Sequence, residues 1–80
     1  MAEQAILVID AGTSTIRCHV FDREGVEMAA DHTAWPPSTA ATDLPLAREW
    51  NPEAVVSAVY GLIGRVLGSV DVEVASVAVT

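Results

Sequence analysis

Basic residues and cysteine are both scarce in this sequence. Four basic residues stand against eleven acidic ones, which gives a formal net charge of −7 with the histidines neutral. This charge argues against nucleic acid or an anionic membrane as a partner, because both would repel the chain. The single cysteine, Cys18, excludes an intrachain disulfide framework and a cysteine-based zinc cluster.

Long apolar runs are also missing. The longest strictly apolar run covers residues 5–9, which is far too short to span a membrane. Residues 1–4 contain no basic group and begin no long apolar stretch, so we expect no secretory signal there. We therefore expect a cytoplasmic protein that binds neither membranes nor nucleic acid.

Apolar side chains are nevertheless abundant for so short a chain. The hydrophobic fraction is 51 % and charged residues make up 19 %, so the chain has enough apolar surface to fold. Eighty residues form at most one small domain, which buries only roughly 60 % of its unfolded surface. The sequence also stops within an apolar stretch that reads as a strand. We expect these residues to be the first part of a longer protein.

Apolar patterning predicts three strands, a helix and a fourth strand. The predicted strands cover residues 5–9, 15–21, 26–33 and 72–79, with a hairpin turn at 22–25. Asn51 is expected to cap a helix that starts at Pro52 and stops near Gly68. Residues 34–50 hold three prolines and no sustained period, and are predicted to be a loop.

The order β-β-β-α-β implies an α/β fold with one mixed sheet. A right-handed helical crossover places the fourth strand parallel to the first and beside it, which gives the order 3-2-1-4 with strand two antiparallel. This arrangement opens a ribonuclease H-like sheet, the fold of actin-like ATPases. Four valines of the last strand cannot all face one side of a regular sheet, so exposed apolar surface is expected. They are Val72, Val74, Val77 and Val79.

The strongest local signal for chemistry follows the first strand. Asp10 ends a buried strand, where a carboxylate needs solvent, a hydrogen bond or a cation. Gly12 allows close approach to the backbone, and with Thr13 and Ser14 it offers N–H groups and two hydroxyls around one point, as in a phosphate-binding nest. Asp10 could hold Mg²⁺, mostly through water. A plain hairpin turn with a capping Asp is the alternative.

These residues, with the segment that follows them, resemble a known motif. Residues 9–17, Ile-Asp-Ala-Gly-Thr-Ser-Thr-Ile-Arg, and the hairpin with Phe21-Asp22 and Gly25 are similar to the first phosphate motif of the actin, Hsp70 and sugar kinase superfamily. Arg17 after the turn, and Glu49-Trp50-Asn51-Pro52-Glu53 at the helix start, resemble the FGGY carbohydrate kinases, the family of glycerol kinase and xylulokinase. That family usually has Asp where Asn51 stands.

The resemblance implies an ATP-dependent kinase that phosphorylates a hydroxyl of a sugar or polyol. Asp10 would lie by Mg²⁺ and the transferred phosphoryl group, Gly12, Thr13 and Ser14 by the nucleotide's phosphates, and Arg17 would project toward Asp10 from the polar face of its strand. An exposed surface arginine is the alternative for Arg17.

The resemblance also implies what these residues lack. The catalytic Asp, the sugar-binding loop, the rest of the N-terminal domain and the C-terminal lobe would follow Thr80. We therefore expect the 80 residues alone to be inactive. The sugar cannot be identified, and the oligomeric state, a homo-oligomer of the full-length enzyme included, stays open. A chaperone-type or actin-type ATPase and a small non-enzymatic module are the alternatives.

Other candidate residues carry weaker signals. His19 and His32 are far apart in the sequence and have no cysteine nearby, so a metal site is not expected. Cys18 alternates with Ile16 and Val20, which predicts a small core residue rather than a nucleophile.

Overall fold

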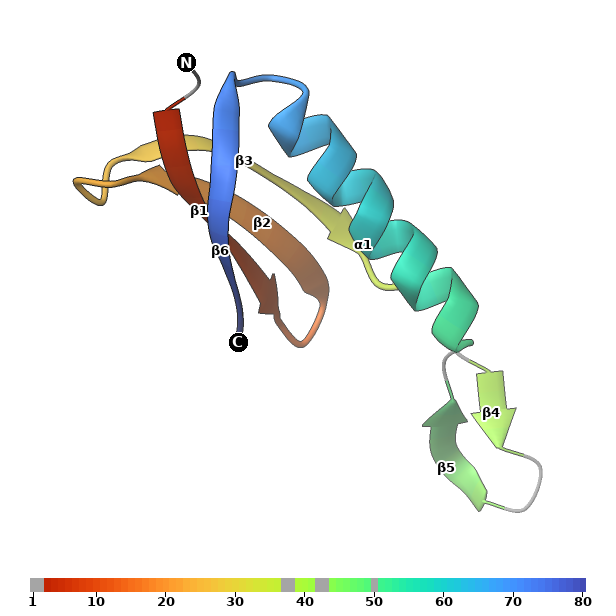
Figure 1. Cartoon of the computed structure of the whole chain (residues 1–80). Helices are drawn as coiled ribbons and strands as arrows, with labels where there is room; N and C mark the ends of the chain where they lie inside the picture. The colour runs from red at the N-terminus through yellow and green to blue at the C-terminus, as the bar shows by residue number, and fades with distance from the viewer. Residues whose placement is uncertain (1–2, 37–38, 42–43, 50) are drawn as a thin grey trace.

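The computed structural model describes residues 3–36, 39–41, 44–49 and 51–80 (Figure 1). The elements in chain order are β1 (Glu3–Ala11), β2 (Thr15–Asp22), β3 (Glu27–Ala34), β4 (Thr39–Ala41), β5 (Leu44–Glu49), α1 (Pro52–Leu67) and β6 (Val72–Val79). No helix among them is long and apolar enough to cross a membrane.

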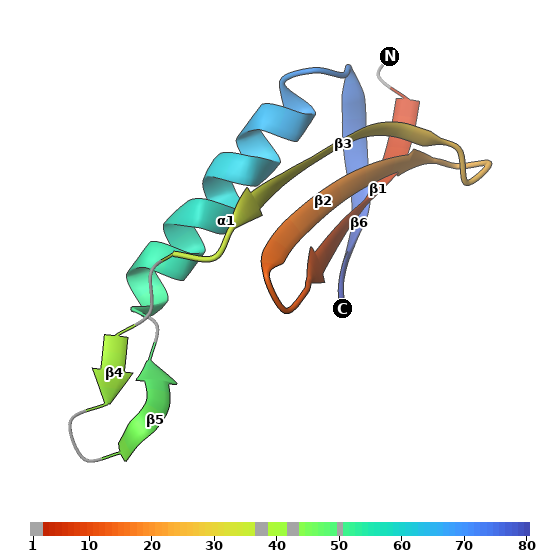
Figure 2. The same cartoon turned by 180° about the vertical axis from the view of Figure 1, so that it is seen from behind.

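Four strands form one mixed sheet in the order β3-β2-β1-β6. β2 is antiparallel to both β1 and β3, and β6 lies parallel to β1. This confirms the predicted 3-2-1-4 order and the single crossover helix of a small α/β fold. Figure 2, seen from behind, shows α1 running along one side of the sheet.

The core lies between α1 and the adjacent faces of β1 and β2. Alternate residues of both strands point toward the helix, as the period of two requires. Among the residues whose burial the structure describes, the buried set is Ala5, Leu7, Ile9, Ile16, Cys18, Val20, Leu62 and Val66. The predicted division of β2 is confirmed, because Ile16, Cys18 and Val20 are buried whereas Arg17 is exposed.

Helix α1 is fixed at both ends by specific contacts. The Asn51 side-chain oxygen accepts from the backbone N–H of Glu53 at 2.9 Å and of Ala54 at 3.4 Å, which confirms the predicted N-cap. Near the other end, Arg65 Nε donates to Asp31 Oδ2 of β3 at 3.1 Å. The backbone N–H of His32 and this Arg65 side chain lower the pKa of Asp31.

The last strand differs from its prediction. Between the pairs Ala5↔Val74 and Ile6↔Ser76 the register shifts by one residue, so Ala75 forms a bulge in β6. The bulge restores the alternation, and all four valines of β6 share the face of their β1 partners. The expectation that they could not face one side was wrong, because it assumed a regular strand.

The predicted loop at residues 34–50 was also wrong in part. β4 and β5 pair antiparallel there, with Thr39 opposite Glu49 and Ala40 opposite Arg48. This two-stranded ribbon lies beyond the N-terminal end of α1, away from the main sheet (Figure 1). The three prolines of this segment and its lack of a sustained period had favoured a loop over two short strands. Trp50 and residues 37–38 and 42–43 lie outside the described residues.

Candidate functional site

The candidate site starts at the carboxyl end of the central strand. Asp10 is half-buried on β1 and lies directly opposite Arg17 of β2 in the antiparallel register. On the other side, the backbone of Thr80 bonds to β1, with Thr80 N–H donating to Ile9 O at 2.9 Å. Directly paired residues of neighbouring strands project to the same face, so Asp10 and Arg17 share the face of the sheet that α1 does not cover.

The turn at residues 12–14 joins β1 to β2 and is closed by a hydrogen bond of its own backbone. Gly12 N–H donates to Thr15 O at 3.0 Å. A Cβ added at Gly12 would lie 3.0 Å from the same carbonyl oxygen, so a side chain there would be a tight fit that requires this backbone to shift. Gly12 therefore contributes space rather than a free N–H group, which refines the predicted nest.

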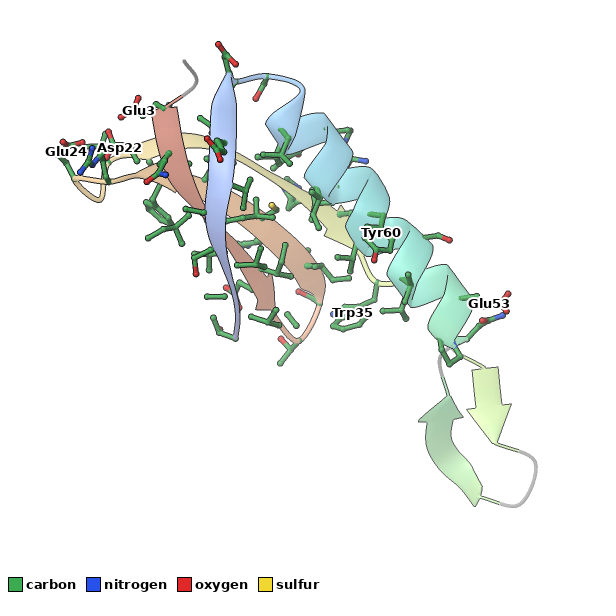
Figure 3. All side chains as sticks on the ribbon, viewed as in Figure 1. Glu3, Asp22, Glu24, Trp35, Glu53 and Tyr60 are labelled. Carbon is green, nitrogen blue, oxygen red and sulfur yellow. The ribbon has the colours of Figure 1, made fainter. Side chains whose placement is uncertain are left out.

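Trp35 fixes the turn from outside. Its indole Nε1–H donates to Gly12 O at 2.8 Å, across a separation of 23 residues. Figure 3 shows Trp35 in the region between the sheet and α1. The backbone of the turn is thus held on its N–H side by Thr15 and on its C=O side by Trp35. The sequence predicted no role in the site for this tryptophan.

Thr13 and Ser14 carry the groups that remain available to a ligand. Both residues are exposed, and within the described part of the chain no backbone or side-chain group accepts from their N–H groups. Their hydroxyls stand on the same turn. Two N–H donors and two hydroxyls next to the Asp10 carboxylate suit a phosphate accompanied by a hydrated cation. The Asp10 carboxylate fits a hydrated Mg²⁺, and the N–H and hydroxyl donors fit phosphate oxygens.

Arg17 does not join this group. Within the described residues it takes part in no ion pair, with Asp10 or any other carboxylate. Its side chain instead lines a hollow of about 560 Å³ over β2 and β3, together with His19, Ala30, Asp31 and His32. The structure thus brings Asp10, Gly12, Thr13 and Ser14 together and turns Arg17 toward β3.

Neither histidine belongs to a metal-binding group in the described part of the chain. His19 Nδ1 contacts Glu27 Oε1 at 2.5 Å, and its ring stacks on Phe21 with centroids 5.9 Å apart. The one group of potential ligands found there is Glu3, Asp22 and Glu24, at the opposite end of the sheet (Figure 3). Asp22 Oδ1 already accepts from two backbone N–H groups of the β2–β3 turn. Asp22 therefore caps this turn.

Cys18 is a core residue, as predicted. Its side chain has 0 % exposure. Burial raises the pKa of the Cys18 thiol, and the nearby negative charge of Asp31 raises it further. A thiol in this environment is a poor nucleophile.

An apolar groove of about 280 Å³ lies on the helix side of the sheet. It separates the first half of α1 from the end of β6, since α1 leans over β2 and β3. The lining residues are Ile9, Val55, Val56, Val59, Tyr60, Ile63, Val77 and Val79. Tyr60 is 70 % and Val79 72 % exposed. Apolar surface of this kind is costly to leave in water.

Comparison with models of known protein families found no match, and a search of curated proteins found none either. The function is therefore inferred from the residue types and the geometry of the site.

Proposed function

We propose that this chain is the nucleotide-phosphate-binding part of an ATP-dependent carbohydrate kinase of the FGGY family. The observation that carries the proposal is the position of Asp10, at the carboxyl end of the central strand, beside a turn with two available N–H groups. The strand order supports it, because a ribonuclease H-like sheet begins with this order. The carboxyl end of a buried strand is a common position for a ligand site in α/β proteins.

In this proposal each group has a separate task. The Asp10 carboxylate holds water molecules of the Mg²⁺ shell, and the N–H groups of Thr13 and Ser14 donate to phosphate oxygens. Bound Mg²⁺ supplies neutralising charge for phosphoryl transfer. Gly12 leaves room for the phosphates, and Trp35 keeps the turn in one conformation through the Gly12 carbonyl. Positioning of this kind accounts for much of the catalysis in phosphoryl transfer.

The described residues contain no group suited to take a proton from an attacking hydroxyl at this turn. The proposal therefore places the catalytic base, the sugar and the adenosine pocket in other parts of a longer protein that contains this chain. The open apolar groove between α1 and β6 supports this view, because further elements of the same domain would cover it.

The test uses the enzyme encoded by the complete reading frame that contains these residues. Asp10→Asn keeps the side-chain shape and removes the charge, so kcat at saturating Mg·ATP should fall at least roughly a hundredfold. Thr13→Ala should cost less, about one hydrogen bond or 0.5–1.5 kcal/mol. Asp71→Asn, an exposed acid before β6, is the matched control. Arg17→Ala should leave kcat near the parent value, because the Arg17 side chain lines the hollow over β2 and β3 and does not join the turn.

Normal turnover in Asp10→Asn would reduce the turn to a simple hairpin connection. ATP hydrolysis that no sugar or polyol stimulates would favour the chaperone-type or actin-type alternative instead.

A further inference from the structure

The hollow over β2 and β3 collects basic side chains on an acidic protein. The chain has four basic residues and two histidines, and three of these six side chains, those of Arg17, His19 and His32, line this hollow. The lining is completed by Ala30 and Asp31. In a chain with a net charge of −7, this grouping marks the place where an anion is least repelled.

A bulge in β3 creates the grouping. Next to the hairpin Phe21 lies opposite Glu27, but further along Val20 lies opposite Ala29, so Met28 is an extra residue. The one-residue shift places His32, rather than Asp31, opposite Arg17. It also moves Asp31 to the other face, where its carboxylate accepts from Arg65. Without the bulge, Asp31 would lie opposite Arg17 in β3 in place of His32.

The hydrogen bonds leave two donors available. His19 is held by Glu27, and Asp31 is held by Arg65 and by the backbone N–H of His32. Within the described part of the chain, neither the Arg17 guanidinium nor the His32 imidazole has a hydrogen-bonding or ion-pair partner. Arg17 and His32 lie directly opposite each other on adjacent strands. Directly opposed side chains are close enough for both groups to bind one ligand.

We propose that this hollow binds a phosphate dianion, as free phosphate or as the phosphate group of a small phosphomonoester. The planar fork of Arg17 can donate two parallel hydrogen bonds to two oxygens of one tetrahedral anion. His32 donates to a third oxygen from the neighbouring strand. The site is separate from the turn at residues 12–14, and the proposal does not rest on the kinase function.

The test is an NMR titration of the ¹⁵N-labelled 80-residue chain with sodium phosphate in EDTA, at constant ionic strength maintained with chloride. Saturable shifts are expected at the amides of Ala30 and His32, with Thr13 and Ser14 unchanged. Arg17→Gln should weaken phosphate binding at least roughly tenfold, and His32→Gln by a smaller factor. Arg23→Gln, on the exposed β2–β3 turn, is the matched control and should bind as the parent does.

Titrations with further ligands distinguish free phosphate from a phosphomonoester. Glucose 6-phosphate that binds more tightly than phosphate, with glucose itself inactive, would assign the site to a phosphomonoester, and equal affinities would assign it to free phosphate. The proposal is overturned if shifts do not saturate, if Arg17→Gln binds as the parent does, or if Thr13 and Ser14 respond instead. It is also overturned if Mg·ATP is the only one of these ligands that binds and Asp10→Asn abolishes the binding of Mg·ATP. Phosphate binding that survives Asp10→Asn supports the hollow whatever the outcome of the kinase test.

Discussion

Trp35 and Gly12 are joined by a 2.8 Å hydrogen bond from the indole Nε1–H to the backbone carbonyl, which ties the end of β3 to the β1–β2 turn. The turn therefore depends on a residue outside its own hairpin. Its conformation follows from the tertiary structure as much as from the local sequence.

Trp35→Phe should loosen this turn while leaving the sheet intact. The substitution keeps an aromatic ring but removes the donor to Gly12, so the free energy of unfolding should fall by about 1 kcal/mol. Amide exchange at Thr13 and Ser14 should accelerate more than exchange in β1. Tyr60→Phe, on the exposed face of α1, is the control and should change neither quantity. Unchanged exchange in Trp35→Phe would show that the local sequence alone shapes the turn.

Two glycine substitutions should have opposite signs. Gly25 has φ +84° in the β2–β3 turn, where a Cβ is strained, so Gly25→Ala should destabilise the fold by about 1–2 kcal/mol. A Cβ at Gly61 of α1 meets no atom within 4 Å, and Gly61→Ala should stabilise by about 0.5–1 kcal/mol through helix propensity. Urea denaturation of both variants measures the difference. A destabilised Gly61→Ala variant would mean that another element packs closely there.

The Asp31–Arg65 contact should make the free energy of unfolding decrease at acidic pH. Folding lowers the pKa of Asp31 from an unfolded value of about 3.9. Its contribution is therefore complete above about pH 4 and is lost as the pH falls through the lower folded pKa. Arg65→Gln should raise the pKa of Asp31 only part of the way, because the larger cause, the His32 N–H, remains.

Titration of the Asp31 carboxyl carbon by NMR measures this pKa directly. Arg23→Gln serves as the charge-matched control and should leave the titration unchanged. A complete return of the pKa to the unfolded value in Arg65→Gln would contradict the stated order of causes.

The Cys18 thiol should not react with thiol reagents until the chain unfolds. Its complete burial and raised pKa leave little accessible thiolate, so a thiol reagent at neutral pH should react only in denaturant. Cys18→Ser should destabilise by about 1–3 kcal/mol, because the core offers a hydroxyl no partner. Cys18→Ala should cost less. Fast labelling under native conditions would show that α1 opens from the sheet.

The sequence predicted the parts of the fold that bury one face. In β2 and α1 the apolar period corresponds to a buried surface, and the continuous apolar run of β1 predicts a central strand, although only one face of β1 is fully buried. Strand order, several core residues and the Asn51 cap could therefore be predicted. The bulges could not, since the pattern was interpreted as regular strands. β6 did carry a signal: one residue separates Val72 from Val74, but two separate Val74 from Val77. That change of spacing is what a bulge at Ala75 produces.

The sequence predicted the part of the site whose residues are close together in the chain. It did not predict the contacts that depend on the pairing register of the strands. Asp10, Gly12, Thr13 and Ser14 are consecutive or nearly so, and the structure keeps them together. The surroundings of Arg17 depend on the extra residue Met28 in β3, and the sequence of β3 alone does not show which of Asp31 and His32 shares its face. The bond from Trp35 to Gly12 spans the whole β2–β3 hairpin and has no sequence signature.

The position of β6 has a consequence for how the molecule behaves in concentrated solution. Within the described part of the chain β6 is hydrogen-bonded to β1 on one side only, and Glu73 is the one charged residue along it. Its outer side is a template that a strand of another molecule can extend without any unfolding. Self-assembly should therefore start from native molecules, with lag times that shorten steeply as protein concentration rises. A lysine in place of Ser76 or Ala78 should lengthen them.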